Sequence, residues 1–236
     1  WGNLARKLAH EIKNPLTPIQ LTIDRLKNKY STGVNESNSE NFNENLKVIN
    51  NQIKQIENLV NEFSDFARMP KPILRKNNLV DIINENIKLL SELDKSIEIV
   101  FVKNSEKIFF ECDQEQLSRV FLNLIKNSIE SIQQKSENIS NFNKKITIEL
   151  VHNNSQISIT IKDNGIGFEN FKENIKDVLN PYITSKKNGT GLGLSIVNKI
   201  VNDHNGKIEF ISIKDGAKIK VIFIIKNEWR NFNRWW

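Results

Sequence analysis

A histidine with two polar neighbours lies near the start of the chain. His10 is followed directly by Glu11, and Asn14 lies one helical turn further on. A carboxylate that accepts the proton of one imidazole nitrogen makes the other nitrogen a better nucleophile. Asn14 shares a helical face with His10, where its amide could orient a water molecule or a phosphoryl group. These residue types indicate nucleophilic chemistry at His10.

Two structural explanations of His10 compete with this hypothesis. At about 100° per residue, His10 lies about 165° from the centre of the apolar stripe of its predicted helix, which argues against a core histidine. A surface histidine without a function remains an alternative, since histidines are often exposed.

Two asparagines four residues apart, Asn123 and Asn127, share one face of a predicted helix. Asparagine is a mediocre helix former, and each of these residues alone is readily explained as solvated. Their apolar neighbours Leu122, Leu124 and Ile125 favour a function for the pair. An amide oxygen is a suitable ligand for Mg²⁺, which prefers oxygen.

A glycine-containing segment, Asp163-Asn164-Gly165-Ile166-Gly167, follows a predicted strand. Its glycines would let the backbone turn tightly or pass close to a flat ligand. The carboxylate of Asp163 could accept a hydrogen bond from an exocyclic amine. A plain turn explains the same residues.

A second glycine-rich run, GTGLGL at residues 189–194, opens a predicted helix. Backbone N–H groups at a helix N-terminus favour phosphate. The run follows a polar loop rather than a buried parallel strand, so it is not a dinucleotide-binding fingerprint. Lys186 and Lys187 precede it and could reach terminal phosphates, although two solvated loop lysines are the simpler explanation.

Two long amphipathic helices are predicted to carry the first of these groups, over residues 3–30 and after a polar loop at 31–43. Apolar residues recur in them at steps of three and four: Leu8, Ile12, Leu16, Ile19, Ile23 and Leu26, then Leu46, Ile49, Ile53, Ile56, Val60 and Phe63. Two such helices form a hairpin that alone buries too little surface. We therefore expect a homodimer through residues 1–68, in which two hairpins make a four-helix bundle.

The remainder predicts an α+β sandwich with a mixed sheet. The prolines of Met69-Pro70-Lys71-Pro72 end the second helix and mark the boundary. Further helices are predicted over 79–94, from the N-cap Asp113 through Ile132, and over 191–204. Strands are predicted over 97–102, 107–111, 146–150, 157–161, 207–213 and 218–225, with turns at Asn153-Asn154 and Asp215-Gly216. Residues 168–190 are predicted to form an irregular lid.

Composition excludes several classes of protein. The 236 residues contain one cysteine, Cys112, so an internal disulfide is impossible, and the three histidines are too far apart for a His-rich metal site. No apolar run is long enough to span a membrane. The net charge of +6 invites a nucleic-acid hypothesis, but the lysines are scattered and no binding motif accompanies them.

In this order along the chain, the motifs closely resemble those of the cytoplasmic core of two-component sensor histidine kinases. LAHEIKNPLTPIQL is similar to the phospho-acceptor box of that family, and QLSRVFLNLIKNSIES to its N box. DNGIGF and GTGLGLSIV are similar to its two glycine boxes. The opening segment further resembles the NtrY-type nitrogen-regulation members.

The resemblance implies a division into domains. A helical-hairpin dimerisation and histidine-phosphotransfer domain would cover 1–69, followed by a linker at 70–74. A GHKL (Bergerat-type) α/β-sandwich ATP-binding domain, of the kind shared with gyrase, Hsp90 and MutL, would cover 75–226, with a tail at 227–236. We expect the cytoplasmic part of an inner-membrane protein, with its membrane segments upstream of this stretch.

The resemblance also implies roles for single residues, with ATP and Mg²⁺ as cofactors. His10 would accept the γ-phosphoryl group, with Glu11 as general base and Asn14 orienting water for dephosphorylation of the partner. Asn127 would ligate Mg²⁺, and Asp163 would bind the adenine amine. The other nucleotide-binding residues would be Asn123, Gly165, Gly167, Lys186, Thr190, Gly191, Leu192 and Gly193. Glu130 and Ser131 depart from the family, in which some members have Lys and Tyr there.

The function expected from the resemblance is autophosphorylation of His10, followed by phosphoryl transfer to an aspartate of a response regulator. Phosphatase action on that regulator through Asn14 is a second expected activity. Two alternatives are an ATPase of the gyrase–Hsp90 type, in which the His10-Glu11 helix has no role, and a non-catalytic dimeric scaffold that binds nucleotide. A nucleic-acid binder is disfavoured.

Overall fold

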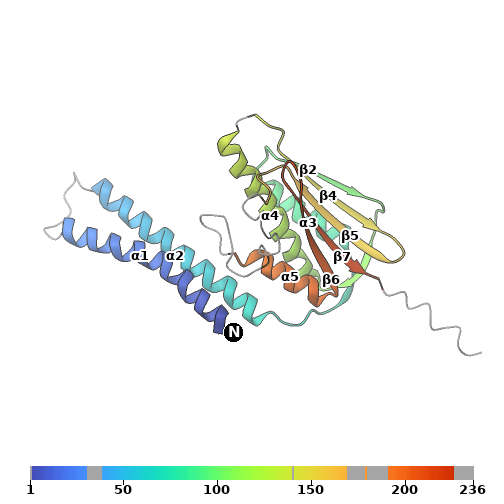
Figure 1. Cartoon of the computed structure of the whole chain (residues 1–236), viewed down its shortest axis with the longest axis horizontal. Helices are drawn as coiled ribbons and strands as arrows, with labels where there is room; N and C mark the ends of the chain where they lie inside the picture. Colours follow the sequence, from blue (N-terminus) through green and yellow to red (C-terminus); the bar gives the residue numbers. More distant parts are fainter. Residues whose placement is uncertain (1, 31–38, 140, 169–178, 180–190, 226–236) are drawn as a thin grey trace, which may run out of the picture. The chain divides into compact units, whose positions relative to one another are not determined.

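The computed structural model describes residues 2–30, 39–139, 141–168, 179 and 191–225 (Figure 1). The side chains of residues 2–11, 30, 39, 40 and 65–68 lie outside this description. The chain divides into two units. Of the described residues, 2–30, 39–69, 191 and 192 belong to the first, and 70–139, 141–168, 179 and 193–225 belong to the second.

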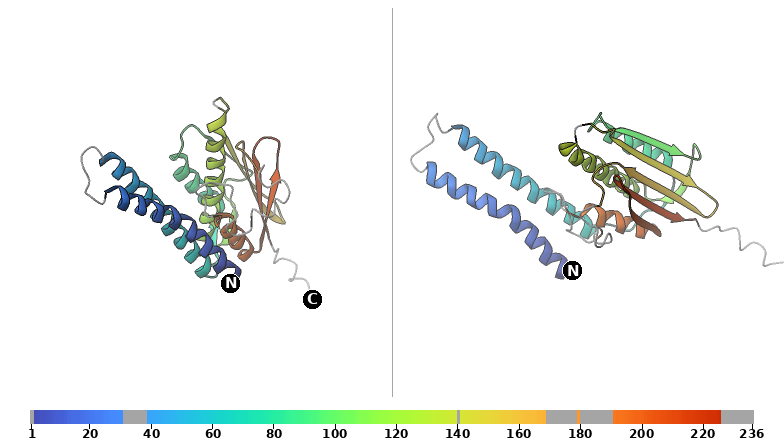
Figure 2. Two further views of the ribbon diagram at one scale, coloured as in Figure 1. Left: turned by 60° about the vertical axis from the view of Figure 1, so that its left-hand side comes forward. Right: turned by 45° about the horizontal axis from the view of Figure 1, so that its top comes forward.

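Two long helices, α1 (Gly2–Tyr30) and α2 (Ser39–Arg68), pack along each other as the predicted hairpin (Figure 2). The predicted loop at 31–43 is too long, because residues 39–43 are already helical. Phe42 explains the difference. It lies one heptad before Ile49 and is half-buried, so it extends the apolar stripe of α2 into a segment whose other residues are polar.

The apolar stripe of the hairpin is covered along one edge only. Buried side chains next to it are Pro15, Thr22 and Leu59. The stripe positions Ile12, Ile19, Leu26, Ile49, Ile56 and Phe63 are half-buried. The remaining stripe positions Leu16, Ile23, Leu46, Ile53 and Val60 are 37–49% exposed. A single chain therefore leaves one edge of its predicted seam in contact with solvent.

The second unit is built on a five-stranded mixed sheet in the order β2-β4-β5-β7-β6. Its strands are β2 (Glu98–Lys103), β4 (Lys145–His152), β5 (Gln156–Asp163), β6 (Gly206–Ser212) and β7 (Ala217–Ile224). β2 runs parallel to β4, and the other neighbours are antiparallel. The sheet confirms the predicted pairing of β4 with β5 and of β6 with β7.

Three helices, α3 (Leu79–Ser91), α4 (Gln114–Asn138) and α5 (Gly193–Asp203), lie on one face of this sheet (Figures 1 and 2). Alternation along the strands turns apolar side chains toward these helices, and Ile146, Ile148 and Leu150 are completely buried. The predicted N-cap of α4 is confirmed, since Asp113 Oδ1 accepts a hydrogen bond from Gln116 N at 3.1 Å.

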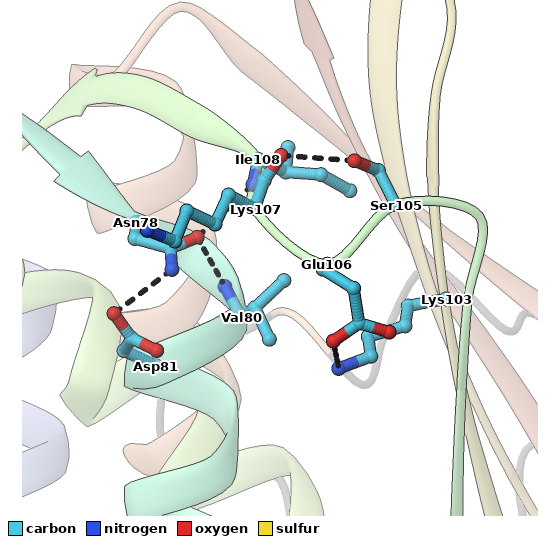
Figure 3. A network of polar contacts seen from close by, with 8 residues as sticks. All are labelled: Asn78, Val80, Asp81, Lys103, Ser105, Glu106, Lys107 and Ile108. Carbon is cyan, nitrogen blue, oxygen red and sulfur yellow. Dashed lines mark hydrogen bonds and ion pairs between the residues drawn. The ribbon is translucent and has the colours of Figure 1, made fainter.

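A short second sheet was not predicted. β1 (Arg75–Asn78) pairs antiparallel with β3 (Phe109–Cys112), the strand predicted at 107–111. The sequence RKNN contains no strong strand former, so tertiary contacts hold β1 in place. Asn78 supplies one of them, because its Oδ1 accepts from Ile108 N at 3.0 Å. The same oxygen also accepts from Val80 N, two residues further on, at 3.3 Å (Figure 3).

Candidate active site

Helix α4 carries the two asparagines that the sequence singled out. Asn123 Nδ2 donates to Arg119 O one turn earlier, at 2.9 Å. The Oδ1 of Asn123 lies beside the first residue of α5, since a Cβ placed on Gly193 would be only 3.1 Å from it. Asn127 follows one turn later and is half-exposed. The structure thus brings Asn123 and Gly193 together.

Asp163 ends β5 between two neighbouring strands, in register with Ile146 and with Ala217. Its side chain is only 4% exposed. Oδ1 accepts from Gly165 N at 3.0 Å and from the hydroxyl of Ser131, on α4, at 3.5 Å. The carboxylate is therefore held at the junction between the sheet and α4.

Burial raises the pKa of Asp163 above its ordinary value of 3.8. Hydrogen bonds oppose this effect and come from the backbone N–H groups of Gly165 and Ala217 and the hydroxyls of Ser128 and Ser131. The net direction shows that desolvation outweighs these donors. A carboxylate in this setting gains from any further hydrogen-bond donor that a ligand brings.

The glycines after Asp163 are required for two different reasons. Gly165 lies against α4, and a Cβ there would collide with the side chain and backbone of Ser131. Gly167 has a φ of 69°, which favours glycine, and it lies against Gly216, whose φ is 102°. The glycines therefore allow a close approach of backbone, as expected. The partners in this approach are α4 and Gly216 of the same unit.

Sequence reasoning missed three residues of this site. Ser128 and Ser131 donate to Asp163, and Asn164 Oδ1 accepts from Lys145 N at 2.9 Å at the start of β4. A signal was available for the serines. Ser131 lies four residues after Asn127, on the same helical face, and Ser128 lies three residues before Ser131, next to it on the helix surface. Asn164 had no such signal, because its partner lies 19 residues away on another strand.

The other sequence-predicted site residues are only partly described. α1 is continuous through residues 10–14, so His10 and Asn14 lie four residues apart on one helical face. The side chains of His10 and Glu11 lie outside the description, whereas Asn14 is exposed. Lys186, Thr190 and most of the predicted lid also lie outside it. Gly191 has a φ of 69°, and Leu192 is buried.

The sequence predicts an amide oxygen, that of Asn127, as the ligand for a metal ion. Among the described residues, no three His, Cys, Asp or Glu side chains cluster in a way that could hold a metal ion. Cys112 is buried, and burial raises the pKa of its thiol to about 11, so the thiol is protonated and not activated as a nucleophile at neutral pH. The amide of Asn127 is a hard oxygen donor, which fits Mg²⁺ ligated mainly by water and phosphate.

None of the helices in the described ranges combines the length and apolar character that a membrane crossing needs.

Two family models match the chain. The family described as "His Kinase A (phospho-acceptor) domain" matches residues 1–72. The family described as "Histidine kinase-, DNA gyrase B-, and HSP90-like ATPase" matches residues 112–228. The two matches cover most of the chain and include both groups of candidate residues.

Two curated proteins are similar over nearly the whole chain. An NtrY-like sensor histidine kinase of Rickettsia prowazekii (strain Madrid E) is 37% identical over 227 residues, which are 96% of this chain and 36% of that protein. The nitrogen regulation protein NtrY of Azorhizobium caulinodans is 34% identical over 229 residues, which are 97% of this chain and 29% of that protein. The chain thus spans about a third of the length of these relatives.

A solved structure shares the fold. The crystal structure of histidine kinase ThkA in complex with response regulator protein TrrA aligns with a TM-score of 0.73 and 24% sequence identity, covering 97% of this chain and 63% of that one.

Proposed function

Because the chain belongs to the sensor histidine kinases and is of the NtrY type, we propose that it phosphorylates His10 with ATP and passes the phosphoryl group to an aspartate of a response regulator. The observation that carries this proposal is the junction at Asp163. A desolvated carboxylate, held between the sheet and the asparagine-bearing helix α4, lies within the part of the chain that matches an ATP-binding family.

In this proposal, nucleotide binding is divided among the residues of the second unit and the glycine-rich run. Asp163 accepts a hydrogen bond from the adenine amine, and Asn123 and Asn127 line the pocket from α4. Gly191 and Gly193 bring backbone N–H groups to the phosphates, where Lys186 adds positive charge. The other contributors are Gly165, Gly167, Thr190 and Leu192.

Asn127 is the residue proposed to hold Mg²⁺. Its amide oxygen matches the preference of this ion for hard oxygen donors, with water and phosphate completing the ligand set. When bound, Mg²⁺ neutralises charge on the phosphates. Phosphoryl transfer depends mainly on such neutralisation and on positioning.

The proposed nucleophile is a ring nitrogen of His10. It forms a bond to the γ-phosphorus of ATP as the bond from that phosphorus to the oxygen of ADP breaks. Glu11 accepts the proton of the other ring nitrogen, which keeps the attacking nitrogen electron-rich.

The experiment that tests this function is labelling with γ-labelled ATP and Mg²⁺. The native chain should acquire an acid-labile, base-stable label, and His10→Ala should abolish it. His152→Ala is the matched control, because His152 is an exposed histidine on β4, and its label should equal that of the native chain. A label that persists in His10→Ala would show that His10 is not the acceptor.

Asn14 supports a second proposed activity, dephosphorylation of the regulator. It is exposed and lies one turn after His10 on the same face of α1, where its amide can orient a water molecule. Asn14→Ala should leave labelling of His10 intact and lengthen the lifetime of the phosphorylated regulator. An unchanged lifetime would exclude this role.

Two partners belong to the same proposal. The uncovered edge of the hairpin stripe, 37–49% exposed, supports a homodimer through residues 1–68. The response regulator is supported by ThkA, which has the same fold and was solved in complex with TrrA.

A further inference from the structure

Ser131 lies where α4 meets the turn that follows β5, and the proposed function gives it no role of its own. Its hydroxyl accepts a hydrogen bond from Ile166 N at 3.1 Å and donates to Asp163 Oδ1 at 3.5 Å. Ile166 N also approaches Ser131 O at 3.3 Å. One residue of α4 thus contacts both the start and the end of the Asp163–Ile166 turn.

This use of the hydroxyl is unusual for a serine inside a helix. Such serines commonly bond to the carbonyl group one turn earlier on their own helix. Ser136 on the same helix does this, donating to Ile132 O at 2.8 Å. The hydroxyl of Ser131 is directed instead to the turn, so it stabilises the position of the turn against α4.

The packing around Ser131 restricts the carboxylate of Asp163. A Cβ on Gly165 would come within 2.7 Å of Ile132 N and would also collide with Ser131, so the turn lies directly on the helix. Gly165 N donates to Asp163 Oδ1, the same oxygen that Ser131 approaches. The strands on either side fix the Asp163 backbone. Two donors thereby fix Asp163 Oδ1, the Gly165 N–H in the turn and the Ser131 hydroxyl on the helix.

We propose that Ser131 is a positioning residue for base recognition, which sets the direction in which the Asp163 carboxylate accepts a hydrogen bond from the exocyclic amine of the nucleobase. This inference rests on the proposed function, in which Asp163 binds the adenine amine of ATP. Ser131 acts only through Asp163 and the turn. Hydrogen bonds weaken steeply when donor and acceptor lose their alignment, so a freed carboxylate discriminates less between an amine and another group.

Two nucleotides test the inference. Inosine triphosphate carries an oxygen in place of the exocyclic amine of ATP. Ser131→Ala should weaken ATP binding about tenfold and inosine triphosphate binding by less than about twofold, because only ATP uses the positioned carboxylate. In the labelling reaction the KM for ATP should rise, while kcat at saturating ATP stays at the native value.

Two further variants separate positioning from packing. Ser136→Ala removes a hydroxyl from the same helix without touching the turn, so it should keep the native preference for ATP. Ser131→Cys keeps a side chain of similar shape with a weak hydrogen-bonding group, so it should resemble Ser131→Ala.

The outcomes distinguish this inference from the proposed function. If the native chain prefers ATP and both Ser131 variants keep that preference, Ser131 does not position Asp163, although the proposed function stands. A fall in kcat with unchanged KM would also overturn the inference and indicate a role in phosphoryl transfer or in folding. A native chain that binds neither nucleotide would overturn the proposed function and this inference together.

Discussion

At the scale of single residues, Asp163 is a buried carboxyl group at the proposed nucleotide site. The carboxylate is desolvated, and its backbone is fixed between two strands. Protein donors compensate only part of the desolvation, because the pKa remains above the ordinary value of 3.8. The residue therefore carries an unfavourable free energy when no ligand is bound, and a donor from the ligand recovers part of it.

The raised pKa predicts how ATP binding depends on pH. In the proposed function the ionised carboxylate accepts a hydrogen bond from the adenine amine, and protonation makes it a weaker acceptor. Because the pKa of Asp163 is raised, ATP affinity should fall as pH decreases through a window above 3.8, and it should be constant at higher pH. Titration of ATP binding across this range measures the effect.

Asp163→Asn is the control for this dependence. Its amide oxygen can still accept from Gly165 N, which leaves an NH2 donor in place of the second acceptor oxygen. The variant should therefore weaken ATP binding at least about tenfold and abolish the pH dependence. An affinity of the native chain that stays constant down to pH 3.8 would contradict the prediction.

At the scale of elements, the start of α4 joins three segments of the second unit. Asp113 Oδ1 caps α4 at Gln116 N, and its Oδ2 accepts from Ile73 N at 2.9 Å. Its own N–H donates to His204 Nε2, at the end of α5, at 3.1 Å. Gln116 Nε2 reaches Pro70 O at 3.1 Å. The segment predicted as a linker at 70–74 is thus bound to α4.

Elements with local signals were predictable from the sequence, and those that depend on distant partners were not. Asp113 identified the start of α4, because an N-cap is a preference of a single residue. β1 lacked any local signal and forms because it pairs with β3 and because Asn78 bonds to Ile108. The bond from Asp113 to Ile73 spans 40 residues, so no pattern in residues 70–74 reveals it.

The cap predicts the effect of Asp113→Ala. Loss of the N-cap should cost about 1–2 kcal/mol of unfolding free energy in the second unit. Hydrogen exchange of the Ile73 and Gln116 amides should accelerate, which mass spectrometry of the corresponding peptides measures.

Although burial opposes it, backbone hydrogen bonds from Ile73 and Gln116 hold the pKa of Asp113 below 3.8. This stabilisation is therefore present above 3.8 and is lost as pH falls through the lower folded value.

Asp94→Ala serves as the matched variant, since Asp94 bonds to Ser96 in its own loop and to Gln133 far from the start of α4. It should leave exchange at Ile73 at the native rate. Equal acceleration in both variants would mean that the cap does not hold the 70–74 segment.

At the scale of the whole molecule, the hairpin helices keep one edge of their seam uncovered. The heptad pattern predicted the stripe and the pairing of α1 with α2. It did not show which edge of the stripe packs within the hairpin and which stays uncovered, because apolar residues mark a stripe but do not identify the surface that packs on it. In the structure, Ile49 and Ile56 are half-buried, whereas Ile53 and Val60 are 49% and 43% exposed. The exposed edge is the surface on which a second copy would pack.

Substitution of two equally exposed valines tests whether the uncovered edge is the dimer interface. Val60 lies on the uncovered edge of the seam and Val48 lies away from it, and both are 43% exposed. Val60→Glu should convert a dimer into a monomer in sedimentation velocity at micromolar concentration, because a dimer would have to bury the new carboxylate. Val48→Glu should stay dimeric. Dissociation of both variants would point to general destabilisation of the hairpin, and a dimeric Val60→Glu would place the interface elsewhere.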